Sequence, residues 1–198
     1  MEIKDIYENL PTLETERLIL RKITLEDVED MFSYGSNEEV SKYVTWNTHQ
    51  TLADSKGFIE FILNQYEQGK VAPWGIEYKE NGQFIGTIDF VWWQPQQKTA
   101  EIGYVIHQDY WGKGITTEAA KALIQLGFEK MDLARIQARC FVENIGSERV
   151  MEKAGMSYEG TLRKGMFIKG KHQDLKMYAI IDEEYSAQKQ SKQEIFNQ

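Results

Sequence analysis

Residues 101–119 read EIGYVIHQDYWGKGITTEA, and this stretch decides which fold is predicted. Alternating apolar residues predict a strand that ends at Ile106, and a helix is expected to begin near Thr116. Gly112 and Gly114 lie in the loop between them, where glycine lets backbone N–H groups approach a ligand closely. The helix start adds unpaired N–H groups and a partial positive charge. Together these features predict an anion site suited to a diphosphate.

Two other phosphate-binding loops do not match this stretch. A P-loop needs Gly-Lys followed by Ser or Thr, but Gly114 follows Lys113. The dinucleotide-binding fingerprint needs a third glycine at position 117, where this chain has Thr117. A strand-to-helix turn that needs glycine only for its geometry is the simpler alternative to an anion site.

The remaining pattern predicts an α+β fold. Strands are expected at 17–23, 74–78, 84–90, 100–106, 136–142, 158–168 and 175–181, and helices from residue 24 and at 52–68, 116–130 and 147–154. Asn81-Gly82 is a strong hairpin turn, because both residues accept positive φ. A helix separates the strands at 100–106 and 136–142, so these strands are parallel if they are neighbours. Residues 1–14 read as a polar lead-in, and the polar tail at 186–198 is expected to be mobile.

The composition predicts one cytoplasmic domain spanning residues 1–198, with its core at about 13–182. Of the 198 residues, 41% are hydrophobic and 27% charged, which is a globular balance. No stretch approaches the ~20 apolar residues that span a membrane, and no signal peptide is expected. The single Cys140 cannot form an internal disulfide. Three scattered histidines and one cysteine give no metal-ligand spacing, so no metal is expected.

The net charge of −8 disfavours nonspecific binding to nucleic acid, which depends on Lys and Arg contacts with phosphates. It fits a cationic partner, such as an amine or a basic protein tail. Solubility alone is the simpler explanation of an acidic surface.

Residues 110–119, YWGKGITTEA, resemble the acetyl-CoA loop of the GNAT superfamily of N-acetyltransferases. They are most similar to the branch that acetylates N-terminal amines of ribosomal proteins. Three further stretches resemble that branch in the same order: 14–21 as its first strand, 144–156 as its second cofactor segment and 159–163 as the following strand. The resemblance implies the GNAT fold, a mixed, mostly antiparallel sheet of about seven strands with about four helices, splayed in the middle at the cofactor site.

The resemblance also implies which residues contact acetyl-CoA. The strand at 102–106 splays from its neighbour and would bind the pantetheine arm and the thioester carbonyl through the backbone of Tyr104, Val105 and Ile106. The diphosphate would be held by the amides of Gly112, Lys113, Gly114, Ile115, Thr116 and Thr117, and Trp111 would also contact the cofactor. Asn144 and Ser147 would lie beside the pantetheine and the sulfur. Trp111 and Thr116 depart from the superfamily pattern, although tryptophan is familiar in this branch.

Two side chains are candidate catalysts for attack of an amine on the thioester. Glu101 lies on the strand beside the cofactor groove and is the candidate base, directly or through a water; a structural partner for an arginine is the alternative. Ser147 is the candidate acid for the leaving thiolate, because some branch members use a serine three residues after the asparagine. Helix capping together with Asn144 is the alternative for Ser147. His107 and His172 are expected on the surface.

Three functions are compatible with these residues. The leading hypothesis is an N-acetyltransferase that joins acetyl-CoA and a protein N-terminal amine in a ternary complex, as a monomer or homodimer, with no nucleic-acid or membrane partner. The second is the same chemistry on a small amine, such as a polyamine, amino sugar or amino acid. The third is a noncatalytic acetyl-CoA sensor, because Met151 and Met166 stand where relatives carry Tyr and Glu.

Overall fold

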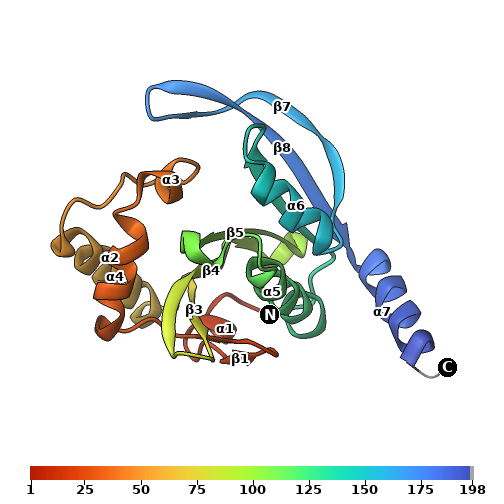
Figure 1. Cartoon of the computed structure of the whole chain (residues 1–198). Helices are drawn as coiled ribbons and strands as arrows, with labels where there is room; N and C mark the ends of the chain where they lie inside the picture. Colours follow the sequence, from red (N-terminus) through yellow and green to blue (C-terminus); the bar gives the residue numbers. More distant parts are fainter. Residues whose placement is uncertain (197–198) are drawn as a thin grey trace.

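The computed structural model describes residues 1–196, which form one mixed sheet with helices on both sides (Figure 1). Eight strands run in the order β1-β2-β3-β4-β5-β6-β8-β7. The strands are β1 (Leu13–Glu14), β2 (Leu18–Arg21), β3 (Trp74–Tyr78), β4 (Gln83–Gln94), β5 (Thr99–Ile106), β6 (Arg135–Phe141), β7 (Ser157–Ile168) and β8 (Lys171–Ile181). The helices are α1 (Lys4–Tyr7), α2 (Val28–Gly35), α3 (Glu38–Ser41), α4 (Leu52–Glu67), α5 (Ile115–Lys130), α6 (Ile145–Lys153) and α7 (Asp182–Phe196), with 3-10 turns η1 (Leu25–Asp27), η2 (Pro95–Gln97) and η3 (Gln108–Tyr110). None of the helices described is long and apolar enough to cross a bilayer.

The predicted α+β fold with a splayed sheet is confirmed. Strands β5 and β6 are parallel and pair only at residues 99–101 with 135–137, so they diverge from Ile102 onward. Every other neighbouring pair is antiparallel. Figure 1 shows α2 and α4 on one side of the central strands and α5 on the other. The opening between β5 and β6 therefore lies in the middle of the molecule.

Local sequence signals fix several element ends. Thr24 and Thr51 each form a capping box with the aspartate three residues later, at the starts of η1 and α4. Gly82 adopts a φ of +69° in the turn between β3 and β4, as the hairpin prediction requires. These ends depend on residues next to one another in the chain, which explains why the sequence predicts them well.

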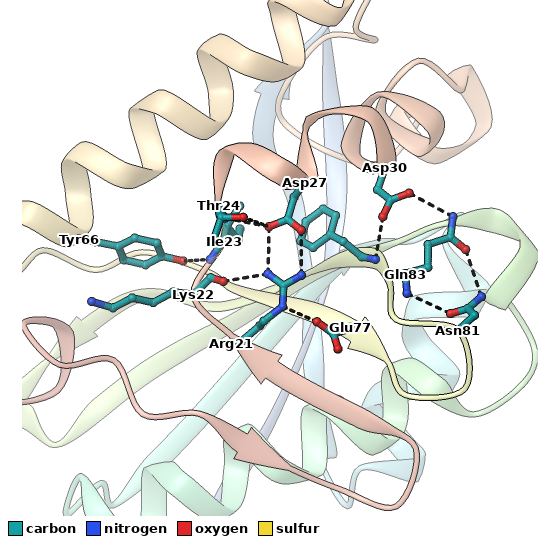
Figure 2. Close-up of polar contacts among 11 residues, drawn as sticks. Arg21, Lys22, Ile23, Thr24, Asp27, Asp30, Tyr66, Glu77, Asn81 and Gln83 are labelled. Carbon is teal, nitrogen blue, oxygen red and sulfur yellow. Dashed lines mark hydrogen bonds and ion pairs between the residues drawn. The ribbon is translucent and has the colours of Figure 1, made fainter.

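A polar network attaches the first helices to the sheet (Figure 2). The Arg21 guanidinium donates to both carboxylate oxygens of Asp27, at 2.9 and 2.8 Å, and also to Glu77. Asp30 accepts a hydrogen bond from the backbone N–H of Phe84 at 3.0 Å. The network joins η1 and α2 to β2, β3 and β4, and so holds the helical layer in register with the sheet.

The two chain ends differ from their predictions. Residues 1–14 are not a polar lead-in, because Ile6, Tyr7 and Leu10 are buried and join the core. The polar tail belongs to helix α7 up to Phe196, residues 197–198 lie outside the described part, and the mobility of the tail stays a prediction. Within residues 1–196 there are eight strands and seven α-helices, where about seven and about four were predicted, because short elements such as β1, α1 and α3 carry too little periodicity to be recognised.

The last hairpin extends beyond the rest of the sheet. Figure 1 shows β7 and β8 arching from α6 toward α3. Near its tip, the Lys169 ammonium donates to the backbone carbonyl of Ser41, the last residue of α3. This hydrogen bond links the tip of the β7–β8 hairpin to the end of α3.

Candidate functional site

The loop before α5 has the backbone geometry that the sequence predicts for an anion site. Gly112 and Gly114 adopt φ of +73° and +76°, a region that glycine enters without the steric cost of a Cβ. The first intrahelical bond runs from the N–H of Glu118 to the carbonyl of Gly114, and no side chain caps the helix. The amides of residues 115–117 are therefore free to donate to a ligand.

A charged clamp holds this loop against the sheet. The carboxylate of Glu118, in the first turn of α5, accepts from the Thr15 hydroxyl at 2.6 Å and from the Arg17 Nε at 2.7 Å. Arg17 also donates to the carbonyl of Lys113 at 3.0 Å. Burial alone would raise the pKa of Glu118, but these hydrogen bonds and the arginine charge lower it. Glu118 is therefore ionised at neutral pH, and the clamp stays intact.

The side chains of this loop, unlike the amides of residues 115–117, already have contacts within the protein or are buried. The Trp111 indole donates to the carbonyl of Ile106 at 3.0 Å and is nearly half exposed. The Lys113 ammonium lies 5.4 Å from the centre of the Tyr110 ring, a cation–π distance. Thr116 and Thr117 are buried. The loop thus offers backbone N–H groups, with the Lys113 ammonium beside them at the surface.

The strand register decides which β5 backbone groups face the opening. His107 donates to the Ile85 carbonyl, and Thr87 pairs with Val105 in the same ladder. Because hydrogen bonds alternate along an antiparallel strand, Val105 is bonded to β4, whereas Tyr104 and Ile106 point toward β6. Of the three residues predicted to bind pantetheine, Tyr104 and Ile106 therefore have backbone groups at the open edge. The carbonyl of Ile106 already accepts a hydrogen bond from the Trp111 indole.

Ser147 and Asn144 lie together at the start of α6. The Asn144 side chain accepts from the Ser147 N–H at 3.1 Å, so the capping role holds for Asn144. The Ser147 hydroxyl lies 2.9 Å from the Tyr104 hydroxyl. Burial raises the pKa of the Tyr104 phenol, so this pair stays protonated at neutral pH. The structure therefore brings the candidate acid next to the open edge of β5.

Glu101 is almost fully buried, at 3% exposure, and both of its carboxylate oxygens have partners. Arg139 donates to one oxygen at 2.9 Å, and Gln137 donates to the other at 2.8 Å. This is the ion pair that the sequence offers as the alternative to catalysis. The role of Glu101 as a base stays a prediction.

Asp89 is a candidate functional residue that sequence reasoning missed. It lies on β4, directly opposite Gly103 of β5, and is partly buried. Burial of its charge, together with repulsion from Glu101, raises the pKa of Asp89 to about 7. A sequence signal does exist, because Asp89 interrupts the apolar run of a central strand, where a charged residue is unusual.

One cavity of about 770 Å³ connects these groups. Its cofactor end is lined by Tyr104, Ile106, Trp111, Gly112, Thr116, Asn144 and Ser147. Its other end reaches the aromatic side chains Tyr43, Trp46, Phe58 and Phe61 of the helical layer and the segment before α4. Four acids, Glu39, Asp89, Glu101 and Glu143, and one base, Arg139, also line it, and this excess of acids favours a cationic ligand.

The two histidines have different environments. His172 is exposed, as predicted, but His107 is buried. The Nδ1 of His107 accepts from the Asp109 N–H, and its Nε2 lies 3.2 Å from the Ser33 hydroxyl. The surface prediction for His107 was wrong, because the turn after β5 folds back onto α2. His107 is a structural residue that joins this turn to the helical layer.

A family model for the acetyltransferase (GNAT) domain matches residues 17–157. The chain belongs to the GNAT acetyltransferase family. The matched region includes most of the residues that line the cavity, among them those of α4, β5, the loop before α5 and the start of α6, whereas Met166 and Leu175 line it from outside that region. The acetyltransferase therefore carries its site within the family's shared fold, and the predicted superfamily is confirmed.

Curated relatives support the same family along most of both chains. The N-acetyltransferase YoaA of Bacillus subtilis, itself uncharacterized, is 35% identical over 171 residues, covering 86% of this chain and 97% of the relative. A ribosomal-protein-serine acetyltransferase of Escherichia coli is 36% identical over 155 residues, covering 72% and 84%. A spermidine N(1)-acetyltransferase of Escherichia coli is 25% identical over 170 residues, covering 85% and 88%.

Solved structures agree with the fold. An acetyltransferase from Bacillus anthracis superposes with a TM-score of 0.78 at 33% identity, covering 87% of this chain and 99% of the other. A microcin self-immunity acetyltransferase, solved with acetyl-CoA and AMP, superposes with a TM-score of 0.76 at 26% identity, covering 84% and 93%. This acetyltransferase is therefore an N-acetyltransferase enzyme, and structural neighbours of its fold bind acetyl-CoA.

The site residues fit acetyl-CoA on features of this structure alone. Free amides at 115–117 and glycines at positive φ suit a diphosphate. The open backbone edge at Tyr104 suits an extended amide-bearing arm. Ser147 lines the same cavity as the acidic side chains.

Proposed function

We propose that this acetyltransferase moves the acetyl group of acetyl-CoA to the N-terminal amine of a protein, by direct attack in a ternary complex. The single observation that carries the proposal is the continuous cavity from the α5 amides to the acidic lining. The relative named ribosomal-protein-serine acetyltransferase supports a protein acceptor. An N-terminal amine has a pKa near ~7.7–8.0 and therefore needs only a modest base.

The chain's own residues have defined tasks in this proposal. The amides from Gly112 to Thr117 bind the diphosphate, and the backbone of Tyr104 orients the thioester arm. Ser147, hydrogen-bonded to Tyr104, hands a proton to the departing thiolate. Burial raises the pKa of the Cys140 thiol to about 11, so this cysteine stays neutral and favours direct attack over an acetyl-cysteine intermediate.

A small amine is the second candidate acceptor. The contact between Lys169 and Ser41 joins the β7–β8 hairpin to α3, a partial cover that suits a small ligand. The acidic and aromatic lining also suits a polyamine, in line with the relative named spermidine N(1)-acetyltransferase.

The test is an acceptor panel with a free-thiol readout. It compares a peptide with a free N-terminal serine, the same peptide with a blocked N-terminus and an internal lysine, and spermidine. The proposal expects the free peptide to be acetylated on its α-amine, by mass spectrometry, and the blocked peptide to be inert. Turnover of spermidine alone would favour the small-amine reading. Acetyl-CoA binding by calorimetry without turnover of any amine would favour a noncatalytic sensor.

A further inference from the structure

Asp89 points to the acceptor side of the opening in the sheet. In the β4–β5 ladder it pairs with Gly103, which shares a strand face with Glu101 two residues earlier. A Cβ built on Gly103 would lie 3.3 Å from the Asp89 Oδ1, so the carboxylate extends over the space that this glycine leaves. The next residue, Tyr104, carries the backbone groups at the open edge. The Asp89 carboxylate therefore lies beside the place where a thioester bound along that edge would meet its acceptor.

Asp89 and Glu101 differ in their partners. Arg139 and Gln137 hold both oxygens of Glu101. Within residues 1–196, the Asp89 carboxylate has no hydrogen bond and no ion pair, although it lines the cavity. Partial burial of a carboxylate without a partner costs stability, so its place in a cavity points to a ligand that supplies the missing proton or positive charge. An ammonium group has both.

We propose that Asp89 is the base that takes the proton of the acceptor ammonium, and that Glu101 acts as the fixed charge that tunes it. The inference rests on the proposed amine acetylation. One ammonium proton moves to an Asp89 oxygen, and the nitrogen lone pair forms the C–N bond with the acetyl carbon. The C–S bond then breaks with its electron pair on sulfur. A second proton from nitrogen neutralises the thiolate through Ser147, and Asp89 returns its proton to solvent.

The electrostatics agree with this role. A carboxylate with a pKa of about 7 accepts a proton readily at neutral pH and still loses it to water. The titratable groups that couple to Asp89 are Glu101 on β5, Tyr7 on α1 and Tyr66 on α4. Burial raises the pKa of both phenols, so they stay neutral, and Glu101 is the charge that acts on Asp89.

The experiment compares pH profiles of kcat/KM for four proteins: wild type, Asp89→Asn, Glu101→Gln and Asp132→Asn. The last variant makes the same carboxyl-to-amide change at an exposed aspartate that pairs with Lys98, outside the cavity. The probes are the free N-terminal serine peptide and spermidine, each with saturating acetyl-CoA. Calorimetry with acetyl-CoA and thermal unfolding show that each variant folds and binds the cosubstrate.

Asp89→Asn is expected to lower kcat/KM at pH 7 by about 10²–10³-fold, within the range for general bases, with acetyl-CoA affinity unchanged. The loss narrows toward pH 9, where the amine deprotonates by itself, a pH dependence that a structural role would not produce. Glu101→Gln is expected to move the acid limb to lower pH with less than a tenfold loss. Asp132→Asn matches wild type.

The opposite pattern overturns the assignment. If kcat/KM of Asp89→Asn stays within threefold of wild type while kcat/KM of Glu101→Gln falls about 10²-fold, Glu101 is the base. The two proposals fail separately. If only spermidine is acetylated, the protein acceptor is wrong and the Asp89 comparison is made on spermidine. If acetyl-CoA binds and no amine is acetylated by the wild type, both proposals fall.

Discussion

Two arginine–carboxylate clusters lie on the sheet. They have similar composition, but within residues 1–196 every carboxylate is paired in one cluster and one carboxylate is unpaired in the other. Arg21 binds both oxygens of Asp27 and one of Glu77, and Figure 2 shows the guanidinium enclosed between them. Its hydrogen bonds link three elements of the fold, and the cluster does not line the cavity. This cluster is complete without any ligand, which is the arrangement expected of a structural ion network.

The second cluster, at Arg139, is incomplete. Arg139 pairs with Glu101, but Asp89 on the neighbouring strand has no partner in the described part of the chain and lines the cavity. The comparison teaches that a paired buried carboxylate indicates architecture, whereas an unpaired one beside a cavity indicates chemistry. The following predictions test that distinction, from the largest effect on stability to the smallest.

Arg21→Met should lower the free energy of unfolding by about 3–5 kcal/mol, because it leaves the Asp27 and Glu77 charges without their partner. Urea denaturation at pH 7 measures this change. The matched control is Arg135→Met, which breaks a more exposed pair with Glu159 and should cost about 1 kcal/mol or less. Equal losses in the two variants would remove the distinction between the clusters.

Asp89→Asn should stabilise the protein, and increasingly so as the pH rises. The folded state, with a pKa of about 7, binds more protons at this site than the unfolded state, whose value is 3.8. The free energy of unfolding of the wild type therefore falls as the pH rises from 4 to 7. The asparagine variant does not titrate at this site, so its free energy of unfolding does not fall in this way. We expect its advantage to grow by up to about 3 kcal/mol between pH 5 and pH 8, in urea unfolding at each pH.

The control for this effect is Asp132→Asn. Its hydrogen bond with Lys98 lowers the pKa of Asp132, so its charge favours the folded state at neutral pH and the variant should gain nothing there. If the effect of Asp89→Asn on stability did not depend on pH, the pKa of Asp89 would be the same in the folded and unfolded states. That result would contradict the raised pKa expected from its position.

Arg17→Met should loosen the loop before α5. The variant loses the bonds to Glu118 and to the carbonyl of Lys113, and we expect a cost of about 1–2 kcal/mol in unfolding free energy. The dissociation constant of acetyl-CoA should rise about tenfold, measured by calorimetry. Lys98→Met removes an exposed ion pair with Asp132, away from the cavity and from the clamp, and it should leave the affinity unchanged.

Gly114→Ala should cost about 1 kcal/mol, because its φ of +76° disfavours a side chain. Gly82→Ala is matched for this strain, with a φ of +69° and open space around its Cβ. Calorimetry should then separate the two variants, with weaker acetyl-CoA binding only in Gly114→Ala. A similar loss of affinity in Gly82→Ala would mean that general destabilisation, and not loop geometry, is being measured.

Features that depend on near neighbours along the chain can be predicted from the sequence. Capping boxes at Thr24 and Thr51, the turn at Gly82 and the positive φ of Gly112 and Gly114 all follow from residues a few positions apart. The order of these elements led to the GNAT family and to the parallel pair β5–β6. Local propensity and chain order are enough for such statements, because the covalent chain itself sets these distances.

Which charges meet depends on how the strands pair in the folded molecule. Arg139 pairs with Glu101 across two strands that are separated in sequence by α5, and Asp89 meets Gly103 through the register of the β4–β5 hairpin. Asp89 is one of 31 acidic residues in the chain, and its sequence neighbourhood does not reveal that it lacks a partner. Pairing across strands depends on register, bulges and packing, which sum many weak contacts over the whole fold. The same reason explains why the burial of Tyr7 and the helix at residues 182–196 appear only in the folded molecule.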